Sequence, residues 1–308
     1  MVNTSSLLAG LVAVSAAEAH YIFSILTHNG KQVGTDYTYI RKNTNTYMPS
    51  YTSEVVNSPD LRCNKGATNA ASQTYTVKAG DTVGAKIWNR ETIEHPGPAF
   101  VYMSKAPGSV SSYDGSGDWF KVWESGPTCG GGPGTDTAWC TWQDTEMSFK
   151  IPANIPSGEW LVRFEHIAIH EGHVGKAQFY MECAQLKIEG GSTGGTGSPA
   201  VKIPGVYKST DPGIALNKWN NPTSYTMPGG PIATFGGSGA GAVSNVAVPG
   251  GNVTTPETPA PVVEEPAEDA AGSVALWKQC GGSGYTGPTA CAEGSCKGIG
   301  GWFSICMP

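Results

Sequence analysis

The sequence predicts an all-β chain: an immunoglobulin-like or fibronectin-like antiparallel β-sandwich with long loops, plus a small disulfide-stapled β mini-domain. Glycine (42) and proline (22) are frequent among the 308 residues and only 14% are charged, a composition typical of strands and loops rather than helices. Short β-rich runs recur between turn residues, and no long stretch keeps a helical period, which favours many short antiparallel strands. The runs that we expect to be strands are 73–77, 82–88, 99–103, 147–151, 159–165 and 178–188.

The charge balance argues against polyanionic partners. Lys and Arg number 19 against 25 Asp and Glu, which gives a net charge of -6. A negative chain has no electrostatic attraction for nucleic acid or for anionic lipid. We therefore expect no nucleic-acid partner, no membrane partner and a monomeric protein.

The first residues have the features of a secretion signal. Residues 7–17 form an apolar run that ends in Ala17-Glu18-Ala19, the small-x-small pattern that signal peptidase cleaves. The run is too short to span a bilayer as a permanent helix. We read residues 1–19 as a signal peptide of a secreted, extracellular protein, so that the mature chain begins at His20. The eight cysteines, an even number, then predict four disulfides.

Three further segments follow the signal peptide. Residues 20–235 hold the expected strands and form the large domain. Residues 236–272 are a Pro-, Gly- and acid-rich flexible linker with no aromatic residue, which cannot bury enough apolar surface to fold. Its Asn252-Val-Thr254 is a glycosylation sequon. Residues 273–308 are a second domain that is too short to fold on a hydrophobic core alone, so its four cysteines are expected to be crosslinked.

The second domain is dense in large aromatic residues, which form either its only core or an exposed strip that stacks on sugar rings. The run Trp277-Lys-Gln-Cys-Gly-Gly-Ser-Gly-Tyr-Thr-Gly-Pro-Thr-Ala-Cys291 and the ending Trp302-Phe-Ser-Ile-Cys306 resemble a fungal family 1 cellulose-binding module. The resemblance implies a planar cellulose-binding face and two disulfides. The face consists of Trp277, Trp302 and Phe303, and the disulfides are Cys280–Cys296 and Cys291–Cys306.

A histidine at a free N-terminus has unusual chemistry. The α-amine and ring Nδ1 of His20 can chelate one metal ion together, and a second histidine adds a third nitrogen in a T arrangement that suits tetragonal Cu(II). Because the amine and the rings must be deprotonated, metal affinity falls in acid. His95 is the candidate second histidine, since His95-Pro-Gly-Pro places it on a rigid turn before an apolar run.

Motifs across the large domain carry a second resemblance. They are His95-Pro-Gly-Pro-Ala-Phe-Val-Tyr-Met-Ser-Lys-Ala106, Leu161-Val-Arg-Phe-Glu-His-Ile-Ala-Ile-His170 and Ala177-Gln-Phe-Tyr-Met-Glu-Cys-Ala-Gln-Leu186. Within the last, Gln178 and Tyr180 face the same side of a strand. Together with 202–213 and 225–229, these motifs resemble the fungal lytic polysaccharide monooxygenases of auxiliary activity family 9.

This resemblance implies a site with one copper ion. His20 and His95 are its implied equatorial ligands, with Tyr180 as a distant axial group. His170 and Gln178 are implied to hydrogen-bond near the oxygen-binding position. The segment between His170 and Gln178 is one residue shorter than the commonest family spacing, which leaves His173 as an alternative to His170. The resemblance also implies that Trp219 contacts substrate and that two disulfides form, Cys63–Cys183 and Cys129–Cys140.

The implied activity is copper-dependent oxidative cleavage of β-1,4-glucan chains in crystalline cellulose. Hydroxylation of a C–H bond next to the glycosidic bond breaks the chain without hydrolysis. Electrons come from an external donor, either a small-molecule reductant or a redox enzyme, and the co-substrate is O2 or H2O2.

Two alternative functions remain open from the residues themselves. The first is a non-catalytic secreted protein that binds copper and cellulose. The second is a β-glucan hydrolase, which needs two carboxyl groups at a defined separation across the sugar. Glu165 is the candidate acid for that reaction, and the competing interpretation is that Glu165 forms an ion pair with a nearby arginine.

Overall fold

The computed structural model describes residues 20–67, 72–88, 91–195, 197–236, 273–274, 279–282, 288–299 and 303–307. The predicted signal peptide 1–19, linker residues 237–272 with Asn252, and the aromatic residues Trp277 and Trp302 lie outside this description. The chain divides into two compact units, Met1–Val246 and Ala247–Pro308. Among the described residues, no helix has the length and apolar character needed to cross a membrane.

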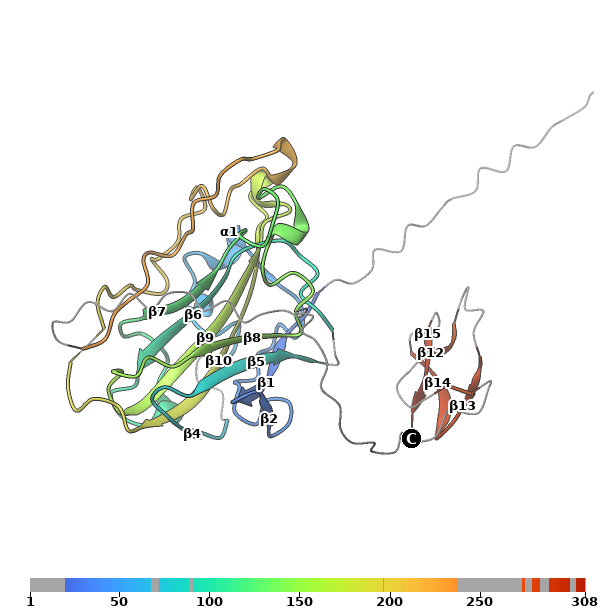
Figure 1. Ribbon diagram of the computed structural model, residues 1–308, viewed down its shortest axis with the longest axis horizontal. Coiled ribbons are helices and arrows are strands. Elements are labelled where there is room, and N and C mark those ends of the chain that lie inside the picture. Colours follow the sequence, from blue (N-terminus) through green and yellow to red (C-terminus); the bar gives the residue numbers. More distant parts are fainter. Residues whose placement is uncertain are drawn as a thin grey trace, which may run out of the picture. The chain divides into compact units, whose positions relative to one another are not determined.

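The large unit is a sandwich of two β-sheets (Figure 1). The smaller sheet has the strand order β2-β1-β5-β8 and every pair in it is antiparallel. Its strands are β1 (Phe23–His28), β2 (Lys31–Val33), β5 (Thr82–Ile87) and β8 (Glu146–Lys150).

The larger sheet has the order β3-β10-β9-β6-β7, and β4 also pairs with β10. Its strands are β3 (Ser50–Tyr51), β4 (Tyr75–Lys78), β6 (Ala99–Lys105), β7 (Phe120–Ser125), β9 (Gly158–Ala168) and β10 (Gln178–Glu189). The β4–β10 pair is parallel, whereas the other pairs are antiparallel. The mostly antiparallel sandwich predicted from the sequence is thus confirmed, with this one parallel pair as an exception.

Both faces of the larger sheet are buried. One face packs on the smaller sheet through side chains such as Phe23, Phe149 and Phe164. The other face carries a second apolar cluster in which strand residues such as Phe179 pack against loop residues such as Trp119 and Tyr207. Because loops cover the outer face, β9 and β10 are buried along nearly their whole length and lack the alternation of a half-exposed strand. The long loops are therefore part of the core.

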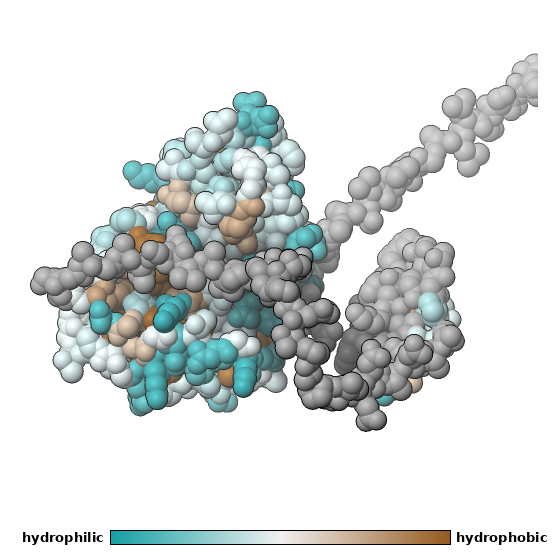
Figure 2. Space-filling view, viewed as in Figure 1, coloured by the Kyte–Doolittle hydropathy of each residue, from teal (hydrophilic) through white to brown (hydrophobic). Residues whose placement is uncertain are grey.

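The described loops contain several short helical segments. They are α1 (Thr52–Val55) and the 3-10 turns η1 (Pro59–Leu61), η3 (Val110–Ser112), η4 (Asp136–Ala138), η5 (Gly172–Val174) and η6 (Lys218–Asn220). On the visible face of the large unit, polar side chains interrupt the apolar ones (Figure 2).

The expected strands match β4, β5, β6, β8, β9 and β10 to within a few residues. The sequence did not predict β1, β2, β3 and β7. In β1 the register shifts between Phe23 and Ile25, and in the β6–β7 pair it shifts between Val101 and Tyr102. Such shifts break the two-residue alternation from which a strand is recognised.

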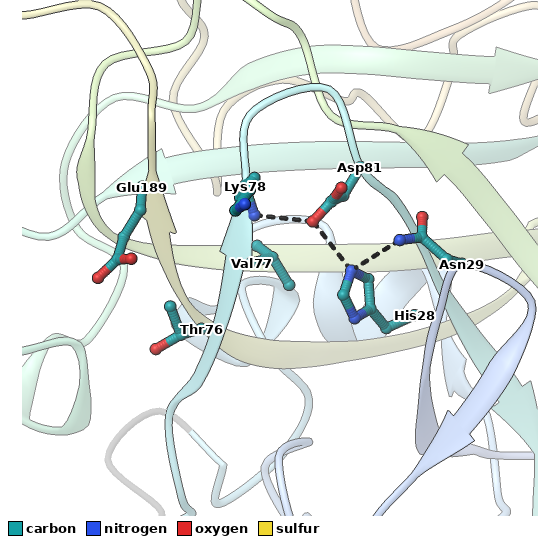
Figure 3. Close-up of a pocket in the computed structure, with 7 residues that line it drawn as sticks. All are labelled: His28, Asn29, Thr76, Val77, Lys78, Asp81 and Glu189. Atoms are coloured by element: carbon teal, nitrogen blue, oxygen red, sulfur yellow. Dashed lines mark hydrogen bonds and ion pairs between the residues drawn. The ribbon is translucent and has the colours of Figure 1, made fainter.

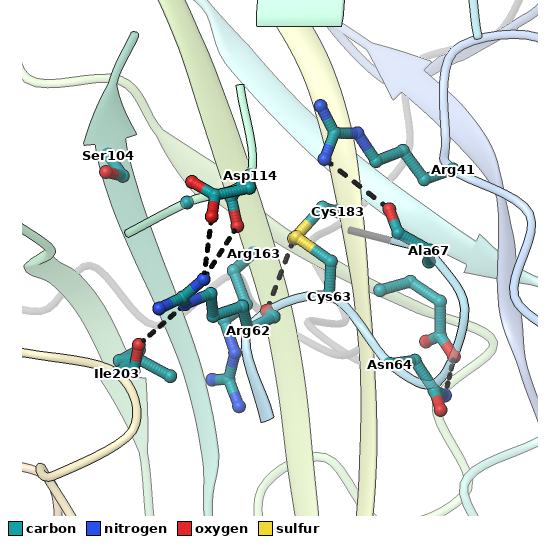
Figure 4. Close-up of a disulfide and its surroundings, with 12 residues drawn as sticks. Arg41, Arg62, Cys63, Asn64, Ala67, Ser104, Asp114, Arg163, Cys183 and Ile203 are labelled. Carbon is teal, nitrogen blue, oxygen red and sulfur yellow. Dashed lines mark hydrogen bonds and ion pairs between the residues drawn. A yellow bond between two sulfur atoms is a disulfide. The ribbon is translucent and has the colours of Figure 1, made fainter. Parts of the chain in front are cut away.

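Disulfides fasten the loops to the strands. Cys63, just after η1, is bonded to Cys183 in the middle of β10 (Figure 4). Around this bond Arg62 donates to the carbonyl of Ile203 and pairs with Asp114, so three loops meet on the outer face of the sheet. A second bond, Cys129–Cys140, closes a short loop around η4. Both are the pairs that the family resemblance implied.

The small unit is also built of β-strands. They are β11 (Ser273–Val274), β12 (Gln279–Gly282), β13 (Ala290–Cys291), β14 (Ser295–Ile299) and β15 (Phe303–Met307). Strands β12, β15 and β14 form one antiparallel sheet, and β11 pairs with β13. The Cys280–Cys296 disulfide crosslinks the unit. The predicted Cys291–Cys306 bond and the Phe303 side chain lie outside the described side chains.

Candidate metal centre

Three rings from distant parts of the chain meet at one end of the large unit. His20 precedes β1, His95 precedes β6, and Tyr180 lies near the start of β10. The ring centroids are 6.0 Å apart for His20 and His95, 6.4 Å for His20 and Tyr180, and 6.1 Å for His95 and Tyr180. The structure thus brings together the three residues expected to surround a metal ion.

The turn that carries His95 is fixed by close packing against β9. A Cβ atom added at Gly97 would collide with the carbonyl oxygen of Ile167, so only glycine allows this approach of the two backbones. The carbonyls of Pro96 and Pro98 accept hydrogen bonds from the N–H groups of Ile169 and Ile167, at 3.0 Å each. These hydrogen bonds continue the pairing of β6 with β9, and they hold the turn predicted from the His-Pro-Gly-Pro sequence against β9.

The surroundings keep His95 neutral and leave one of its nitrogens available. Burial, followed by the nearby His170 and His20, lowers the pKa of His95 to about 3. Its Nε2 atom is buried, and no described residue forms a hydrogen bond to it. A buried polar atom without a partner is costly, and a neutral imidazole nitrogen is a common metal ligand. His95 therefore fits the role of a metal ligand through Nε2.

A third donor for a metal has to come from the main chain. Within the described ranges, no group of three or more His, Cys, Asp and Glu side chains is arranged to hold a metal ion. The His20 and His95 rings could supply two nitrogens, and the α-amine of His20 would be a third if the predicted signal peptide is removed. This donor set of neutral nitrogens matches the preference of copper.

A hydrogen-bonded chain connects Tyr180 to His170. The phenol of Tyr180 donates to Oε1 of Gln178 at 2.8 Å, and Nε2 of Gln178 lies 3.3 Å from Nε2 of His170. The ring of His170 stacks on that of His95, with centroids 4.4 Å apart. Burial lowers the pKa of His170, so a neutral ring can accept from the Gln178 amide. His173, by contrast, is exposed on η5. The geometry therefore favours His170 over His173 as the histidine that hydrogen-bonds with Gln178 beside the proposed metal site.

Two buried residues beside the site were not singled out from the sequence as functional. Tyr21 stacks on Tyr180 with ring centroids 4.1 Å apart, and its phenol oxygen lies 2.6 Å from Nδ1 of His166. Burial is the main cause that raises the pKa of Tyr21 and lowers that of His166 to about 3. The only sequence signal for Tyr21 was its position directly after His20.

Glu182 continues the row of polar side chains on β10, two residues beyond Tyr180. It is 1% exposed, and burial raises the pKa of its carboxyl to about 8. Asn43, Asn64 and the N–H of Phe23 donate to it, but at 3.3–3.4 Å these hydrogen bonds are long. Desolvation therefore outweighs them and favours the protonated acid.

Because the carboxyl group of Glu182 is buried and protonated, we expect the folded protein to become less stable as the pH becomes mildly alkaline. The pKa of Glu182 is higher in the folded protein than in the unfolded chain. The folded state therefore holds a proton that the unfolded chain releases. As a result, the free energy of unfolding falls as the pH rises towards 8. Between pH 6.5 and 8 the wild type should lose about 2 kcal/mol of unfolding free energy relative to Glu182→Gln. Denaturant titrations of both proteins at the two pH values measure this difference, and contributions from other groups cancel. Parallel pH profiles would contradict the assignment.

An exposed tryptophan adjoins the residues proposed to surround a metal ion, His20, His95 and Tyr180, which we call the metal cluster. Trp219, on η6, is 68% exposed, and its Nε1–H donates to the carbonyl of His170 at 2.9 Å. Trp219 is therefore not a core residue. Large apolar side chains that are fully exposed in a folded protein often mark a binding surface.

The other large apolar residues that are exposed within the described ranges also belong to segments at this end. They are Tyr47, Met48, Trp88 and Val174. Trp88 donates its N–H to the carbonyl of Ile22, next to His20. Val174 lies on η5, shortly after His170, and Tyr47 and Met48 lead into β3, which pairs with β10 at Gln178. These four exposed residues therefore lie on chain segments that lead to residues of the metal cluster.

A shallow pocket lies at the opposite end of β1, around His28 (Figure 3). Nε2 of His28 is 2.9 Å from Oδ2 of Asp81, and Nδ1 is 3.2 Å from the hydroxyl of Tyr75. Asp81 also accepts from the backbone N–H of Lys78 at 2.8 Å. Both ring nitrogens are therefore engaged within the protein, and His28 joins neighbouring turns instead of taking part in the metal cluster.

The carboxyl group considered for hydrolysis is inaccessible. Glu165 is 0% exposed, forms two hydrogen bonds with the guanidinium of Arg163 and accepts another from Tyr207. A general acid must reach the leaving oxygen of the substrate. Glu165 cannot, so the ion-pair interpretation of this residue is correct.

Comparison with family models gives two matches. Residues 20–226 match Auxiliary Activity family 9 (formerly GH61), and residues 276–303 match the Fungal cellulose binding domain. The first match covers more than half of the chain and includes all the residues of the metal cluster.

Individual relatives agree with these matches. The chain is 45% identical over 248 residues to AA9 family lytic polysaccharide monooxygenase A of Aspergillus fumigatus, which covers 78% of this chain and 84% of the relative. It is 42% identical over 305 residues to AA9 family lytic polysaccharide monooxygenase E of Podospora anserina, which covers 96% of each. A crystal structure of a cellulose-active polysaccharide monooxygenase from M. thermophila superposes with a TM-score of 0.58 at 32% identity, covering 70% of this chain and 100% of that one.

Proposed function

Because the chain belongs to auxiliary activity family 9, the lytic polysaccharide monooxygenases, we propose that it cleaves β-1,4-glucan chains in crystalline cellulose by copper-dependent oxidation. Family membership implies the dependence on copper. The observation that carries the assignment of the site is the cluster of His20, His95 and Tyr180, in which His95 has a buried nitrogen without a partner. The substrate and the residue roles are inferences from this arrangement.

The chain's own nitrogens would hold the metal. His20 would contribute its ring and, after removal of residues 1–19, its α-amine, and His95 would contribute Nε2. When bound, copper supplies the one-electron chemistry by which O2 or H2O2, with electrons from an external reductant, hydroxylates a C–H bond next to the glycosidic bond. Burial keeps His95 neutral well below pH 7, so its lone pair is available over the working range.

The neighbouring polar groups fix orientation and protonation at the site. Burial raises the pKa of Tyr180, which keeps it a neutral phenol that donates to Gln178. This hydrogen bond directs the amide N–H of Gln178 towards His170. We assign to His170 and Gln178 the hydrogen bonds that would orient the oxygen co-substrate, and to Tyr180 a place beside the metal as a neutral phenol. Preorganised donors of this kind need no rearrangement during reaction.

Binding to a crystalline surface is assigned to two regions. In the large unit, Trp219 is the proposed substrate contact, supported by its exposure beside the metal cluster. In the small unit, the match to a fungal cellulose-binding domain supports a planar face of Trp277, Trp302 and Phe303. The linker over 236–272 would let one module stay attached while the other reacts, because tethering raises the local concentration of substrate.

Secretion follows from the same proposal. The cleavage pattern at Ala17-Glu18-Ala19 would expose His20, on which the copper site depends. The disulfides Cys63–Cys183, Cys129–Cys140 and Cys280–Cys296 are consistent with an oxidising compartment. We propose Asn252, in the linker, as a site of glycosylation.

The test is product analysis by mass spectrometry. The secreted, copper-loaded protein is incubated with cellulose and ascorbate. We expect oligosaccharides whose masses differ by +16 or -2 from the unmodified series and which are absent without reductant. The control is His28→Gln, which removes a histidine whose ring is engaged far from the metal cluster and should leave these products in place.

The two alternative functions predict other outcomes. Unmodified oligosaccharides formed without reductant would indicate hydrolysis and would reject the copper mechanism. Tight binding of copper and cellulose without any products would indicate a binding protein instead.

A further inference from the structure

The exposed indole of Trp219 rests on a buried cation. Nζ of Lys218 lies 4.1 Å from the centroid of the Trp219 ring. The Lys218 side chain is only 4% exposed, whereas Trp219 is 68% exposed. A cation over the face of an indole is attracted to it, and more strongly when the cation is desolvated. Lys218 therefore occupies one face of the ring and leaves the other face open to a ligand.

The ammonium group is held in turn by a loop that is distant in sequence. Nζ of Lys218 donates to Oδ1 of Asp136 at 2.6 Å. Asp136 begins η4, which lies inside the loop closed by the Cys129–Cys140 disulfide. A short hydrogen bond between two charged groups fixes the donor more firmly than a bond between neutral groups does.

The same loop packs tightly on residues 218–225, the segment that carries Trp219. A Cβ atom added at Gly134 would lie 2.8 Å from the carbonyl oxygen of Lys218, too close for any other residue without a shift. At the other end of the segment, Trp139 packs edge-on against Tyr225, with centroids 4.8 Å apart. The disulfide-closed loop thus supports this segment at both ends.

A second restraint acts on the edge of the indole. The Nε1–H of Trp219 donates to the carbonyl of His170, whose ring stacks on His95. The hydrogen bond to His170 fixes the edge of the ring, and the ammonium group of Lys218 fixes its face. Together these two contacts define the orientation of the indole. An aromatic group that is oriented in advance loses less entropy when a ligand stacks on it.

We propose that Lys218, oriented by Asp136 of the Cys129–Cys140 loop, is the positioning residue that holds Trp219 with its free face ready to stack on a sugar ring of a β-1,4-glucan. This inference rests on the proposed function, because Trp219 needs a polysaccharide substrate on which to act. It makes the disulfide-closed loop part of the substrate site through its contacts with Lys218.

The test compares Lys218→Met, Trp219→Ala and the double variant in the full-length, copper-loaded protein. Oxidised products are measured against the concentration of a soluble β-1,4-glucan, and the small unit is identical in every variant. Lys218→Met should raise the apparent KM roughly three- to tenfold, with little change in kcat. In the Trp219→Ala background it should have no further effect, since the two residues act through one contact.

Two variants separate positioning from other effects. Lys218→Arg keeps the cation and should restore the KM of the wild type. Lys202→Met removes an exposed lysine paired with Asp118 and should leave KM unchanged. If Lys218→Met fails to fold, Asp136→Asn takes its place, because the Asp136 side chain is 42% exposed.

The outcomes that reject the proposal are distinct from those that reject the function. An equal rise in KM in both backgrounds, or no rise in either, would overturn the role of Lys218 while oxidised products persist. A Trp219→Ala variant with unchanged KM would overturn it as well. If the wild type forms no oxidised products from cellulose or from the soluble glucan, the proposed function fails, and this inference fails with it. If it oxidises cellulose alone, the same variants are compared on suspended cellulose, with the same outcomes deciding.

Discussion

Replacing His95 by alanine is expected to abolish oxidised products and to weaken Cu(II) binding at least a hundredfold. The variant removes a neutral nitrogen that is already buried and without a hydrogen-bond partner among the described residues. Substitutions of groups that merely support metal ligands cost about 10- to 100-fold in affinity, so loss of a ligand should cost more. Isothermal titration with Cu(II) on the metal-stripped mature protein measures the affinity independently of activity.

His170→Ala is the matched comparison for this prediction. The His170 ring stacks on His95 and contacts Gln178, but the proposed site does not use it as a ligand. We expect copper affinity to fall by about tenfold, which is less than in His95→Ala, and product formation to fall as well. A loss of copper in His170→Ala equal to that in His95→Ala would mean that the ligand assignment is wrong. Thermal unfolding of both variants shows whether the fold persists.

The sequence points to the proposed metal site because its candidate ligands are marked locally. His20 follows a cleavage pattern, and His95 stands before a Pro-Gly-Pro turn, so each is visible without knowledge of the fold. The strands β9 and β10 were visible for a related reason, since both are long and apolar. By contrast, β1 was missed because the register shift at Phe23 and Ile25 conceals its period.

The supporting contacts could not be predicted from local patterns. The Tyr21–His166 contact joins residues 145 positions apart, and Asp136 and Lys218 are 82 positions apart. Neither pair produces a motif, because each partner on its own is an ordinary strand or loop residue. The Tyr21–His166 contact depends on how the residues before β1 pack against β9 between the two sheets, and the Asp136–Lys218 pair depends on how two long loops pack together. The sequence therefore locates the reactive residues more readily than the residues that orient them.

Replacing Glu165 by glutamine is expected to destabilise the large unit by about 3–5 kcal/mol. Burial alone lowers the pKa of Arg163, but the charge and hydrogen bonds of Glu165 outweigh burial and raise it. Without the carboxylate, a fully buried guanidinium loses its counter-ion, and Tyr207 loses its charged acceptor. Chemical denaturation at pH 7 measures the loss. Asp118→Asn, which breaks an exposed pair with Lys202, is the control and should cost less than about 1 kcal/mol.

The same variant distinguishes a structural carboxylate from a catalytic one. An ion pair that only supports the fold predicts that the Glu165→Gln molecules that remain folded form oxidised products at the rate of the wild type. The acid of a hydrolase predicts the reverse, a stable protein without activity, because a catalytic acid is held in place for reaction at the expense of stability. Burial of Glu165 beneath Tyr207 and beside Arg163 favours the first outcome. Measuring stability and product formation on one preparation therefore decides between the two roles.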